Sequence, residues 1–524
     1  MFTENHGVSV SVSFLLQFCG IGRGFDTDFL NSGKKKIMNY RSFKDFVTAA
    51  TMGFLLLAVS GCTKPQAARD TFPKEFVYSE EVPGYSPAVF ENRRQRVMEG
   101  MEGQIALVSA AASEDFYYLT GMMEERGIAV LDPKGEHPFI LFVLPDDPMA
   151  TLWTGDRYGV KGAMERFGAD TAYPLENFHR MLPGLMIGKE TVSLLRGDRS
   201  LAEQVENLQM GKGGPRPSYD LTSLVHEMRV VKDEWEVRQL EKAIDVTCFA
   251  QQRVLQTVTP GQKEYEVQAE IEYVFLKNGL RPGFETITGS GPNAATLHYY
   301  ENRRTLQEGD LLLMDIGAAC NGYTADVTRT IPVSGAFTPE QKELYNLVLK
   351  AQEEAIRLMV PGQKILDCHH RATDVIVKGL YELGLITDTT SWWQRRFYIH
   401  YRNDHYIGLN VHDVGSYGEF NEADRNIYAT PKYRGRDILP GMVLTMEPGI
   451  YLIADRLDHL RRLFGDVATE EELAAFEEQV RPAYEKYAGI GIRIEDDILV
   501  TETGNRVLSG KAPKTVEEIE AAMR

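Results

Sequence analysis

Cysteine, positive charge and repetitive sequence are all scarce in this chain. Only five of the 524 residues are cysteine, and neither a disulfide framework nor a thiolate metal site is expected from their scattered spacing: Cys19, Cys62, Cys248, Cys320 and Cys368. The formal net charge of −18 argues against a nucleic-acid partner, because phosphate binding requires a basic face. No glycine-rich stretch continues into the Gly-Lys-Ser/Thr of a nucleotide loop. The length exceeds what one compact core usually holds and predicts two domains.

The N-terminal region has the composition of an export signal. From Met38, the basic residues Arg41 and Lys44 precede an apolar stretch that ends in Val-Ser-Gly-Cys at Cys62. Small residues directly before a cysteine resemble a bacterial lipoprotein signal; a plain signal peptide or a membrane anchor is the alternative, although the stretch is short for a membrane span. We predict a signal region at 1–61 whose true start is Met38, and a tether at 62–87. The mature protein would be exported to the periplasm or cell surface, with membrane contact only through a lipid on Cys62.

Residues 88–230 predict an α/β domain. Helical spacing at 90–101 is followed by strand-like runs bounded by Gly, Pro or Asp, then by a helix and further strands. The predicted strands are 104–111, 115–121, 127–132, 139–145, 190–197 and 224–231, and the second predicted helix is 159–168. We place the domain boundary near Val230, because a long amphipathic helix begins just after it.

Residues 231–510 are predicted to form one domain from two related halves. The tetrapeptide Pro-Gly-Gln-Lys begins at Pro260 and again at Pro361. Each copy follows a long helix, precedes a second helix and leads to Asn-Gly-Leu or Leu-Gly-Leu. One such match could be chance, because Pro-Gly is a common helix stop, but the shared order on both sides indicates a duplicated unit. Two such halves can pack about a pseudo-twofold axis and line a cleft from both sides. Residues 511–524 are predicted as a C-terminal tail.

Two aspartates frame the most informative stretch of the sequence. Asp315 lies within the apolar run Leu-Leu-Leu-Met-Asp-Ile-Gly, and Asp326 follows Asn321 and Gly322, a strong signal for a two-residue hairpin turn. The register of that turn places both aspartates on one face, within reach of a pair of ions. Two surface carboxylates are the alternative. The apolar run argues against it, and a buried, unpaired carboxylate is costly.

Further acceptors stand in similarly apolar settings. His405 is followed by His412, Glu447 ends an apolar strand, and Glu495 lies in an alternating strand with Arg493 on the same side. Arg493 could neutralise Glu495 by itself, so each residue taken singly is a weak candidate for a metal ligand. Together, one imidazole and four carboxylates form a hard, oxygen-rich site that suits Mn²⁺-like ions better than a lone structural zinc.

In order and setting, these segments resemble the pita-bread metallopeptidases, and the two-domain layout resembles their aminopeptidase P and prolidase branch. The resemblance implies an α/β (α+β) protein with an N-terminal creatinase-like domain and a pseudo-twofold pita-bread catalytic domain. It implies two divalent metal ions, with Mn²⁺ expected and Co²⁺ or Zn²⁺ as alternatives, and a homo-oligomer (dimer or tetramer). The implied metal ligands are Asp315, Asp326, His405, Glu447 and Glu495, with Asp326 and Glu495 bridging. His298 would face the substrate, His412 would stabilise the tetrahedral intermediate, Glu447 would carry a proton and Arg493 would support the site.

Within that branch, residues 147–170 are most similar to aminopeptidase P. The implied activity is hydrolysis of the N-terminal Xaa-Pro bond of proline-containing peptides. A prolidase that cuts only Xaa-Pro dipeptides, or a metal-free binding module of the same fold, is the alternative.

Two features depart from the family pattern. The family often has a histidine four residues before the metal-binding one, whereas His400 is five residues before His405. Residues 454–488, between Glu447 and Glu495, predict two charged helices. We interpret them as an oligomer contact or a decoration rather than a lid.

Overall fold

The computed structural model describes residues 76–79, 84–101, 103–209, 214–418 and 434–524. The predicted signal region and Cys62 lie outside the described residues. Part of the predicted tether packs on the domain predicted at 231–510. Phe76 is buried and packs edge-to-face on Phe249, with ring centroids 6.3 Å apart. The Asn278 side chain donates to the carbonyl oxygen of Phe76 and accepts from the backbone N–H of Tyr78. Residues 76–79 are therefore held on the folded chain.

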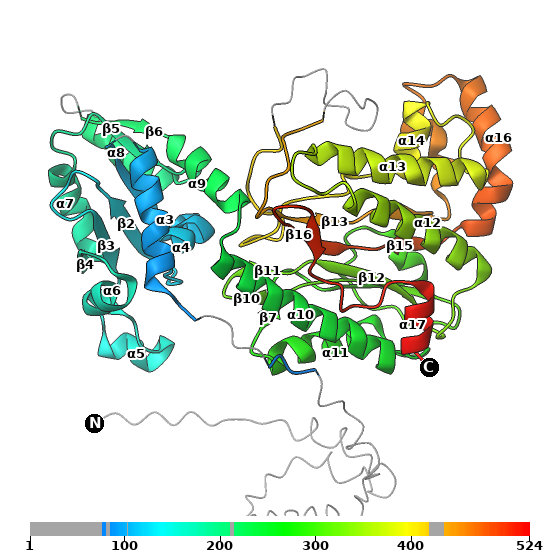
Figure 1. The fold of residues 1–524 in the computed structure, drawn as a ribbon, viewed down its shortest axis with the longest axis horizontal. Helices are drawn as coiled ribbons and strands as arrows, with labels where there is room; N and C mark the ends of the chain where they lie inside the picture. The colour runs from blue at the N-terminus through cyan, green and yellow to red at the C-terminus, as the bar shows by residue number, and fades with distance from the viewer. Residues whose placement is uncertain (1–75, 80–83, 102, 210–213, 419–433) are drawn as a thin grey trace, which may run out of the picture. The chain divides into compact units, whose positions relative to one another are not determined.

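The N-terminal region is a mixed six-stranded sheet with helices on both faces (Figure 1). The strand order is β4-β3-β2-β1-β5-β6; β2 runs antiparallel to β1 and β3, and the outer pairs are parallel. The strands are β1 (Ile105–Ser109), β2 (Gly127–Leu131), β3 (Phe139–Val143), β4 (Thr171–Pro174), β5 (Thr191–Leu194) and β6 (Arg216–Ser218). The helices are α3 (Pro87–Gly100), α4 (Ser113–Thr120), α5 (Pro148–Thr154), α6 (Gly159–Phe167), α7 (Phe178–Leu185), α8 (Arg199–Gln209) and α9 (Asp220–Val230).

Burial on both faces explains why the central strands are apolar without alternation. In β1, Ile105 and Leu107 pack in one core with α7 and α8, whereas Ala106 and Val108 face the other core with α3 and α4. A strand covered on both sides places every side chain in a core, so its sequence becomes a continuous apolar run. The strands predicted at 104–111, 127–132, 139–145 and 190–197 and the helices at 90–101 and 159–168 are confirmed.

Two predicted strands of this region are wrong, because both segments are helices. Residues 115–121 belong to α4, which ends at Gly121 with φ at +72°. The run from Phe116 to Leu119 is buried on all sides, so its aromatic residues suggested a strand and no helical period was visible. Residues 224–231 overlap α9. In this helix, Leu221, Val225 and Met228 are buried at helical spacing. The prediction gave that spacing less weight than the β-like composition of the segment.

The C-terminal region places its helices around short antiparallel sheets (Figure 1). The sheet orders are β12-β9-β8, β13-β16-β17, β11-β10-β7 and β14-β15. The strands are β7 (Arg281–Pro282), β8 (Ile287–Ser290), β9 (Leu311–Ile316), β10 (Ala318–Cys320), β11 (Tyr323–Thr324), β12 (Val327–Pro332), β13 (Val443–Met446), β14 (Gly449–Tyr451), β15 (Gly491–Arg493), β16 (Asp496–Val500) and β17 (Asn505–Val507). The helices are α10 (Glu234–Thr257), α11 (Glu264–Lys277), α12 (Pro339–Ile356), α13 (Ile365–Glu382), α14 (Trp392–Tyr398), α15 (Leu460–Phe464), α16 (Glu470–Tyr487) and α17 (Val516–Ala522).

The internal repeat has the same backbone contacts in both copies. Gly261, between α10 and α11, has φ at +95° and donates its N–H to the Leu306 carbonyl (2.9 Å). Gly362, between α12 and α13, has φ at +82° and donates to the Ile438 carbonyl (3.1 Å). A positive φ explains why each turn carries glycine. Each half therefore contains a helix pair whose turn donates to a later segment of the same half, as expected of a duplicated unit.

Two segments complete this region. Residues 511–524, predicted as a tail, form α17 and pack into the domain, with Val516 and Ile519 buried. Residues 454–488 contain α15 and α16, as predicted, and their apolar sides pack on α14: the Trp393 ring lies 5.0 Å from that of Phe476 and 5.8 Å from that of Phe464.

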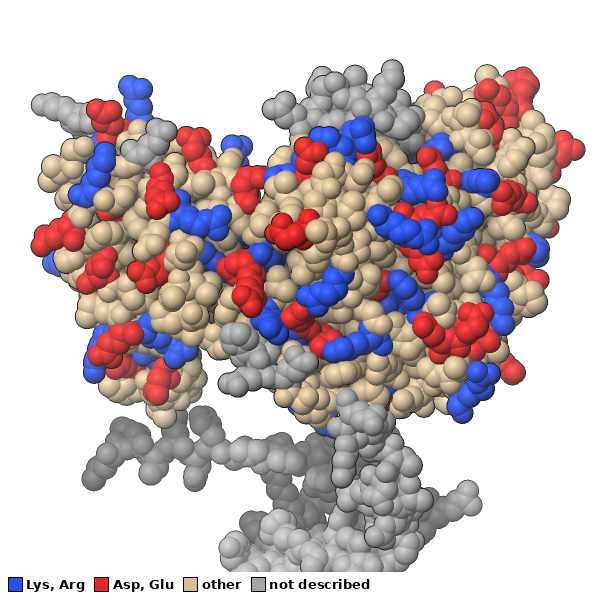
Figure 2. All heavy atoms as spheres, viewed as in Figure 1, with Lys and Arg blue, Asp and Glu red and all other residues tan. Residues whose placement is uncertain are grey.

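The surface carries both signs of charge. On the face shown in Figure 2, acidic and basic side chains are interspersed rather than gathered into areas of one sign. Within the described ranges, none of the helices has the length and apolar character needed to cross a bilayer.

Candidate metal centre

The structure gathers every predicted site residue around one cavity of about 420 Å³. The predicted residues in its lining are His298, Asp315, Asp326, His405, His412, Glu447, Arg493 and Glu495. The sequence did not single out the other lining residues, which are Leu297, Tyr401, Arg402, Asp404, Asp413 and Tyr417. These groups come from segments almost 200 residues apart in the chain, and only folding brings them together.

A tight hairpin places the first two carboxylates. Asn321 and Gly322 have φ values of +49° and +86°, as a two-residue type I′ turn requires. The resulting register runs through β9 and β12, where Asp315 lies opposite Thr328. Asp326 precedes Thr328 by two residues and thus shares its face, so both aspartates reach the same cavity.

Strand β13 anchors three further groups from the second half of the domain. Glu447 follows β13 directly, and its backbone N–H donates to the Asn403 carbonyl (2.8 Å). Thr445, within β13, donates its N–H to the His405 carbonyl (2.9 Å), and its hydroxyl accepts from the His405 N–H (3.1 Å). β16 pairs with β13 and begins just after Glu495. The positions of His405, Glu447 and Glu495 are therefore set by one sheet.

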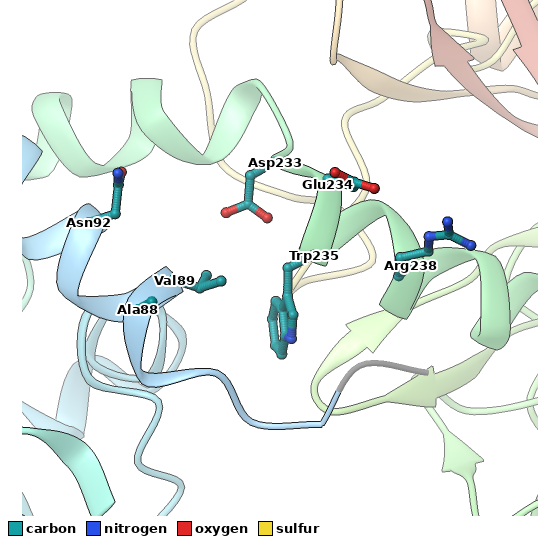
Figure 3. A pocket seen from close by; sticks show the side chains of 7 residues that line it. All are labelled: Ala88, Val89, Asn92, Asp233, Glu234, Trp235 and Arg238. Carbon is teal, nitrogen blue, oxygen red and sulfur yellow. The ribbon is translucent and has the colours of Figure 1, made fainter. Parts of the chain in front are cut away.

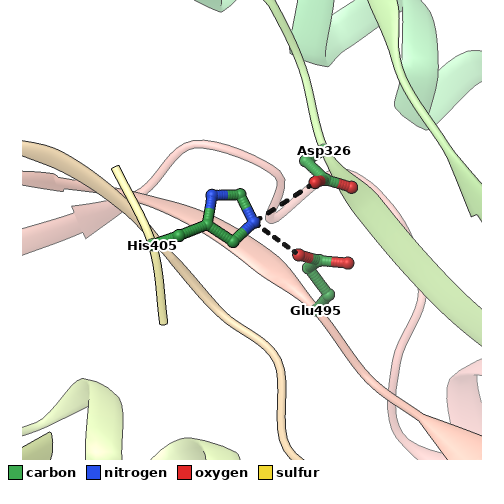
Figure 4. A group of neighbouring side chains, drawn as sticks. All are labelled: Asp326, His405 and Glu495. Atoms are coloured by element: carbon green, nitrogen blue, oxygen red, sulfur yellow. Dashed lines mark ion pairs between the residues drawn. The ribbon is translucent and has the colours of Figure 1, made fainter. Parts of the chain in front are cut away.

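His405 points its Nε2 at a group of carboxylates (Figure 4). This nitrogen lies 3.4 Å from an oxygen of Asp326, 3.4 Å from one of Glu447 and 3.9 Å from one of Glu495. The other ring nitrogen, Nδ1, lies 2.9 Å from the Tyr406 carbonyl oxygen and can only donate to it. That contact assigns the proton of a neutral ring to Nδ1 and leaves the Nε2 lone pair facing the carboxylates, the arrangement of a metal-binding histidine.

Several buried carboxylate oxygens have no hydrogen-bond partner among the described residues. Among the predicted ligands, they are Oδ1 of Asp315, Oδ1 of Asp326 and Oε1 of Glu495. A buried acceptor without a partner costs about 1–3 kcal/mol, and more when it is charged. Ligand atoms of Asp326, His405 and Glu495 lie within 4.8 Å of one another, and all three residues are buried. The donor set therefore fits a bound cation, which would satisfy these oxygens and the His405 lone pair together.

The carboxylates raise one another's pKa in the absence of a cation. Burial, together with Asp315, Asp497 and Glu447, raises the pKa of Asp326 well above its usual value. Burial, followed by the charges of Asp326 and Glu447, does the same to Glu495. Burial raises the pKa of Glu447 to about 7, although His405 and Arg493 partly oppose it. Asp326, Glu447 and Glu495 are thus under-neutralised by the protein itself.

Arg493 supplies a positive charge to the predicted ligands of this cavity, whereas Arg402, which also lines it, pairs with Asp404. The Arg493 guanidinium contacts Asp315, donates to the Tyr451 hydroxyl (2.9 Å) and donates to Thr328 Oγ1 (3.1 Å). Thr328 in turn donates to Oε2 of Glu495 (2.6 Å). One arginine thereby orients two of the four acidic groups and leaves their other oxygens facing the cavity.

The N-terminal region also contacts the segment that carries His412. Asp413 forms buried ion pairs with Arg229 (2.5 Å) and Lys232 (2.9 Å), and Arg229 also pairs with Asp115 in α4 (2.6 Å). Despite burial, Lys232 and Arg229 lower the pKa of Asp413. This network fixes the residue next to His412. The sequence analysis did not identify this network, because Asp115 and Asp413 are about 115 and 180 residues away from Arg229 in the chain.

Other supporting residues were also missed. Thr328 could have been found, because it lies two residues after Asp326 on the same strand face. By the same rule Asp497 could have been found, because it lies two residues after Glu495; it accepts the backbone N–H of Asp326 (3.1 Å). Tyr451 follows no such pattern. His400 does not line this cavity, whereas Tyr401, four residues before His405, does.

Another cavity, about 680 Å³, lies between the N-termini of α3 and α10 (Figure 3). Of its two acidic residues, Asp233 is already engaged, because it caps α10 and accepts from Arg93 (2.8 Å). None of the predicted site residues lines it.

Comparison with known proteins agrees with this geometry. The model of metallopeptidase family M24 matches residues 238–502, and that of the aminopeptidase P N-terminal domain matches residues 111–194. This chain belongs to the M24 metallopeptidase family. The predicted family and fold class are thus confirmed.

The relatives of this M24 protein match more than four fifths of its chain. The Xaa-Pro aminopeptidase of Escherichia coli (strain K12) is 35% identical over 467 residues, which cover 83% of this chain and 97% of that protein. Human Xaa-Pro aminopeptidase 3 is 28% identical over 488 residues, or 86% and 88% of the two chains. The solved structure of Pseudomonas aeruginosa aminopeptidase PepP has a TM-score of 0.71 at 33% identity and covers 84% of this chain and 98% of its own. Zinc-substituted E. coli aminopeptidase P in complex with product has a TM-score of 0.72 at 34% identity, with 84% and 99% covered.

Proposed function

We propose that this M24 protein is an Xaa-Pro aminopeptidase that works with two divalent metal ions, most suitably Mn²⁺. The observation that carries the proposal is the convergence of unpartnered carboxylate oxygens around the Nε2 lone pair of His405. The activity itself is inferred from relatives named Xaa-Pro aminopeptidase, which match the chain across both of its domains.

Five side chains would hold the metal ions. The ligands would be Asp315, Asp326, His405, Glu447 and Glu495. Four carboxylates against one imidazole make a hard donor set, which favours Mn²⁺ over softer ions. When bound, the ions supply Lewis acidity at the scissile carbonyl and lower the pKa of a water.

Side chains of the protein are placed to transfer the protons and to donate the hydrogen bonds that the reaction requires. Glu447 lines the cavity with an oxygen 3.4 Å from His405 Nε2, so it is placed to take a proton from the attacking water and pass it to the leaving nitrogen. Burial and the neighbouring His405 and His298 lower the pKa of His412 to about 4. A neutral His412 can donate an N–H to the oxyanion of the tetrahedral intermediate. His298, exposed in the cavity lining, is placed to contact the substrate.

Proline explains why such an enzyme has a distinct substrate. The nitrogen of an Xaa-Pro bond carries no hydrogen, and the ring fixes φ near −65°. A peptidase that accepts a hydrogen bond from the N–H of the leaving residue cannot make that contact when the residue is proline. Catalysis here uses a proton delivered to that nitrogen instead, so the missing hydrogen is no obstacle.

Peptide length separates this proposal from a prolidase. We expect the metal-loaded protein to release the first residue from an Xaa-Pro-Yaa-Zaa peptide at least as fast as from the Xaa-Pro dipeptide. The measurement is product release by chromatography, with Xaa-Ala-Yaa-Zaa as the matched control, which should be cut about 100-fold more slowly. Cleavage of the dipeptide alone would identify a prolidase.

We also propose export as a lipoprotein anchored at Cys62, supported by the basic, apolar and small-residue order before that cysteine. Cells expressing the full chain and fed labelled fatty acid should yield a labelled protein, and Cys62→Ser should abolish the label. A mature wild-type chain that carries no label and stays in the aqueous fraction would contradict this proposal.

A further inference from the structure

Two buried glutamines lie behind the metal centre, one in each half of the C-terminal region. Gln251 belongs to α10 and Gln352 to α12, and the two residues are 1% and 0% exposed. Their separation in the chain equals that between Pro260 and Pro361, which begin the two copies of Pro-Gly-Gln-Lys. The helix α10 packs against β12, and α12 packs against β13. The two glutamines therefore occupy the same position in the duplicated unit.

The first glutamine joins the two strands next to the first pair of predicted ligands. Gln251 Nε2 donates to the carbonyl oxygens of Met314 (3.4 Å) and Val327 (3.0 Å). Met314 lies in β9 directly before Asp315, and Val327 begins β12 directly after Asp326. One side-chain amide thus bonds to the backbone beside both aspartates.

The second glutamine repeats this arrangement in the other half. Gln352 Nε2 donates to the carbonyl oxygens of Met446 (3.1 Å) and Ile494 (3.2 Å). Met446 lies directly before Glu447, and Ile494 lies directly before Glu495. Each of the four carboxylates therefore has a chain neighbour whose carbonyl accepts from one of the two glutamines.

The hydrogen-bond partners determine which way each amide points. A backbone carbonyl can only accept, so the side-chain atom that faces it must be the amide nitrogen. On the other side of Gln352, Lys514 Nζ donates to Oε1 (3.1 Å). Oε1 of Gln251 is buried and has no hydrogen-bond partner among the described residues. A buried acceptor without a partner destabilises the fold, so stability alone does not account for a glutamine at this position.

We propose that Gln251 and Gln352 are positioning residues of the metal centre, which hold its four carboxylates together in two pairs. The inference rests on the proposed function, because the two residues have this role only if the cavity binds metal ions. Three of the four carbonyls belong to a planar peptide unit that ends at the Cα atom of a ligand, so fixing the carbonyl fixes the ligand's backbone. Without cations the carboxylates repel one another. Each glutamine holds two segments against that repulsion without adding a charge.

The experiment measures the affinity of the metal-free protein for Mn²⁺ by titration calorimetry. Gln251→Met keeps the length of the side chain but removes its donors, and it should weaken binding about 10-fold, as is typical for groups that orient metal ligands. Gln352→Met should weaken binding by a similar factor, and the double variant by about 100-fold. Gln252→Met is the matched control, because this neighbouring glutamine of α10 donates to the Lys511 carbonyl instead (2.7 Å). It should leave the affinity unchanged.

Urea unfolding of the metal-free protein separates positioning from a purely structural role. Gln251→Met should be about as stable as the wild type, because removal of the unpartnered oxygen offsets the two lost hydrogen bonds. A structural role would instead lower the stability and leave the Mn²⁺ affinity of the folded protein unchanged. If Gln251→Met does not fold, Gln352→Met makes the same test in the other half.

The outcomes distinguish this inference from the proposed function. A wild type that binds Mn²⁺ no more tightly than Gln251→Met and Gln352→Met would overturn the inference alone. An equal loss of affinity in Gln252→Met would do the same, because any change in α10 would then suffice. A wild type that binds no Mn²⁺ would overturn the proposed function and this inference with it.

Discussion

The Asp326→Asn variant is expected to lose kcat/KM by about 10³-fold and to retain fewer metal ions per chain than the wild type. Asp326 lies 3.4 Å from His405 Nε2, and its Oδ1 has no partner among the described residues. Asparagine has nearly the same shape but no charge, and its amide nitrogen cannot ligate a cation. The measurement is elemental analysis of the purified protein combined with peptide hydrolysis.

A stability measurement distinguishes this loss from misfolding. Without metal, Asp326 sits among carboxylates that repel it, so metal-free Asp326→Asn should be more stable at pH 7 than the metal-free wild type. Asp437→Asn is the matched control, because its side chain is 56% exposed and pairs with Lys364 on the surface. Full activity of Asp326→Asn with an unchanged metal content would remove the proposed metal centre. A metal-free wild type that binds peptides without cutting them would support the binding-module alternative.

Removal of the metal ions should lower the free energy of unfolding, and by more as the pH rises from 5 to 8. In the metal-free protein, the pKa values of Asp326, Glu447 and Glu495 are raised above their unfolded values of 3.8 to 4.5. Protons held by the folded state are lost as the pH rises through these raised pKa values, so stability present at about pH 4.5 disappears toward neutral pH. The rise of the Glu447 pKa from 4.5 to about 7 alone corresponds to about 3 kcal/mol.

Bound metal reverses this trend. Cations favour the deprotonated carboxylates, so the metal-loaded protein should keep its stability at neutral pH, and metal binding adds stability by mass action. The measurement is urea unfolding with and without a chelator at pH 5, 6, 7 and 8. Metal-free Glu447→Gln should show a flatter pH dependence, whereas Glu485→Gln, which changes an exposed residue of α16, should not. A metal-free wild type whose stability rises between pH 5 and 7 would contradict the charge balance described above.

The hairpin at 321–322 shows where sequence reasoning was sufficient. The conformations that Asn321 and Gly322 adopt are local properties of those residues. Once the turn is set, the period of two along a strand decides which side chains share a face. The placement of Asp315 and Asp326 in one cavity follows from these two rules, without knowledge of the rest of the fold.

The helices α4 and α9 show where it failed. In α4, Phe116 to Leu119 face apolar surroundings on every side, so no period remained in the sequence and their β-like composition misled the prediction. Tertiary packing overrode local propensity. The ion pairs of Asp413 with Arg229 and Lys232 were equally hidden, because no local rule relates residues about 180 positions apart.

The sequence by itself determined the chemistry of this protein: which residues are acidic or basic in apolar settings, where the chain turns, and that a helix pair occurs twice. Tertiary structure alone decided that His405 directs Nε2 rather than Nδ1 at the carboxylates, and that Tyr401 and not His400 lines the metal centre. The physical reason is the distance along the chain over which each kind of interaction acts. Turn geometry and strand alternation act between neighbours, whereas burial and charge balance depend on groups that only the complete fold brings within a few ångströms.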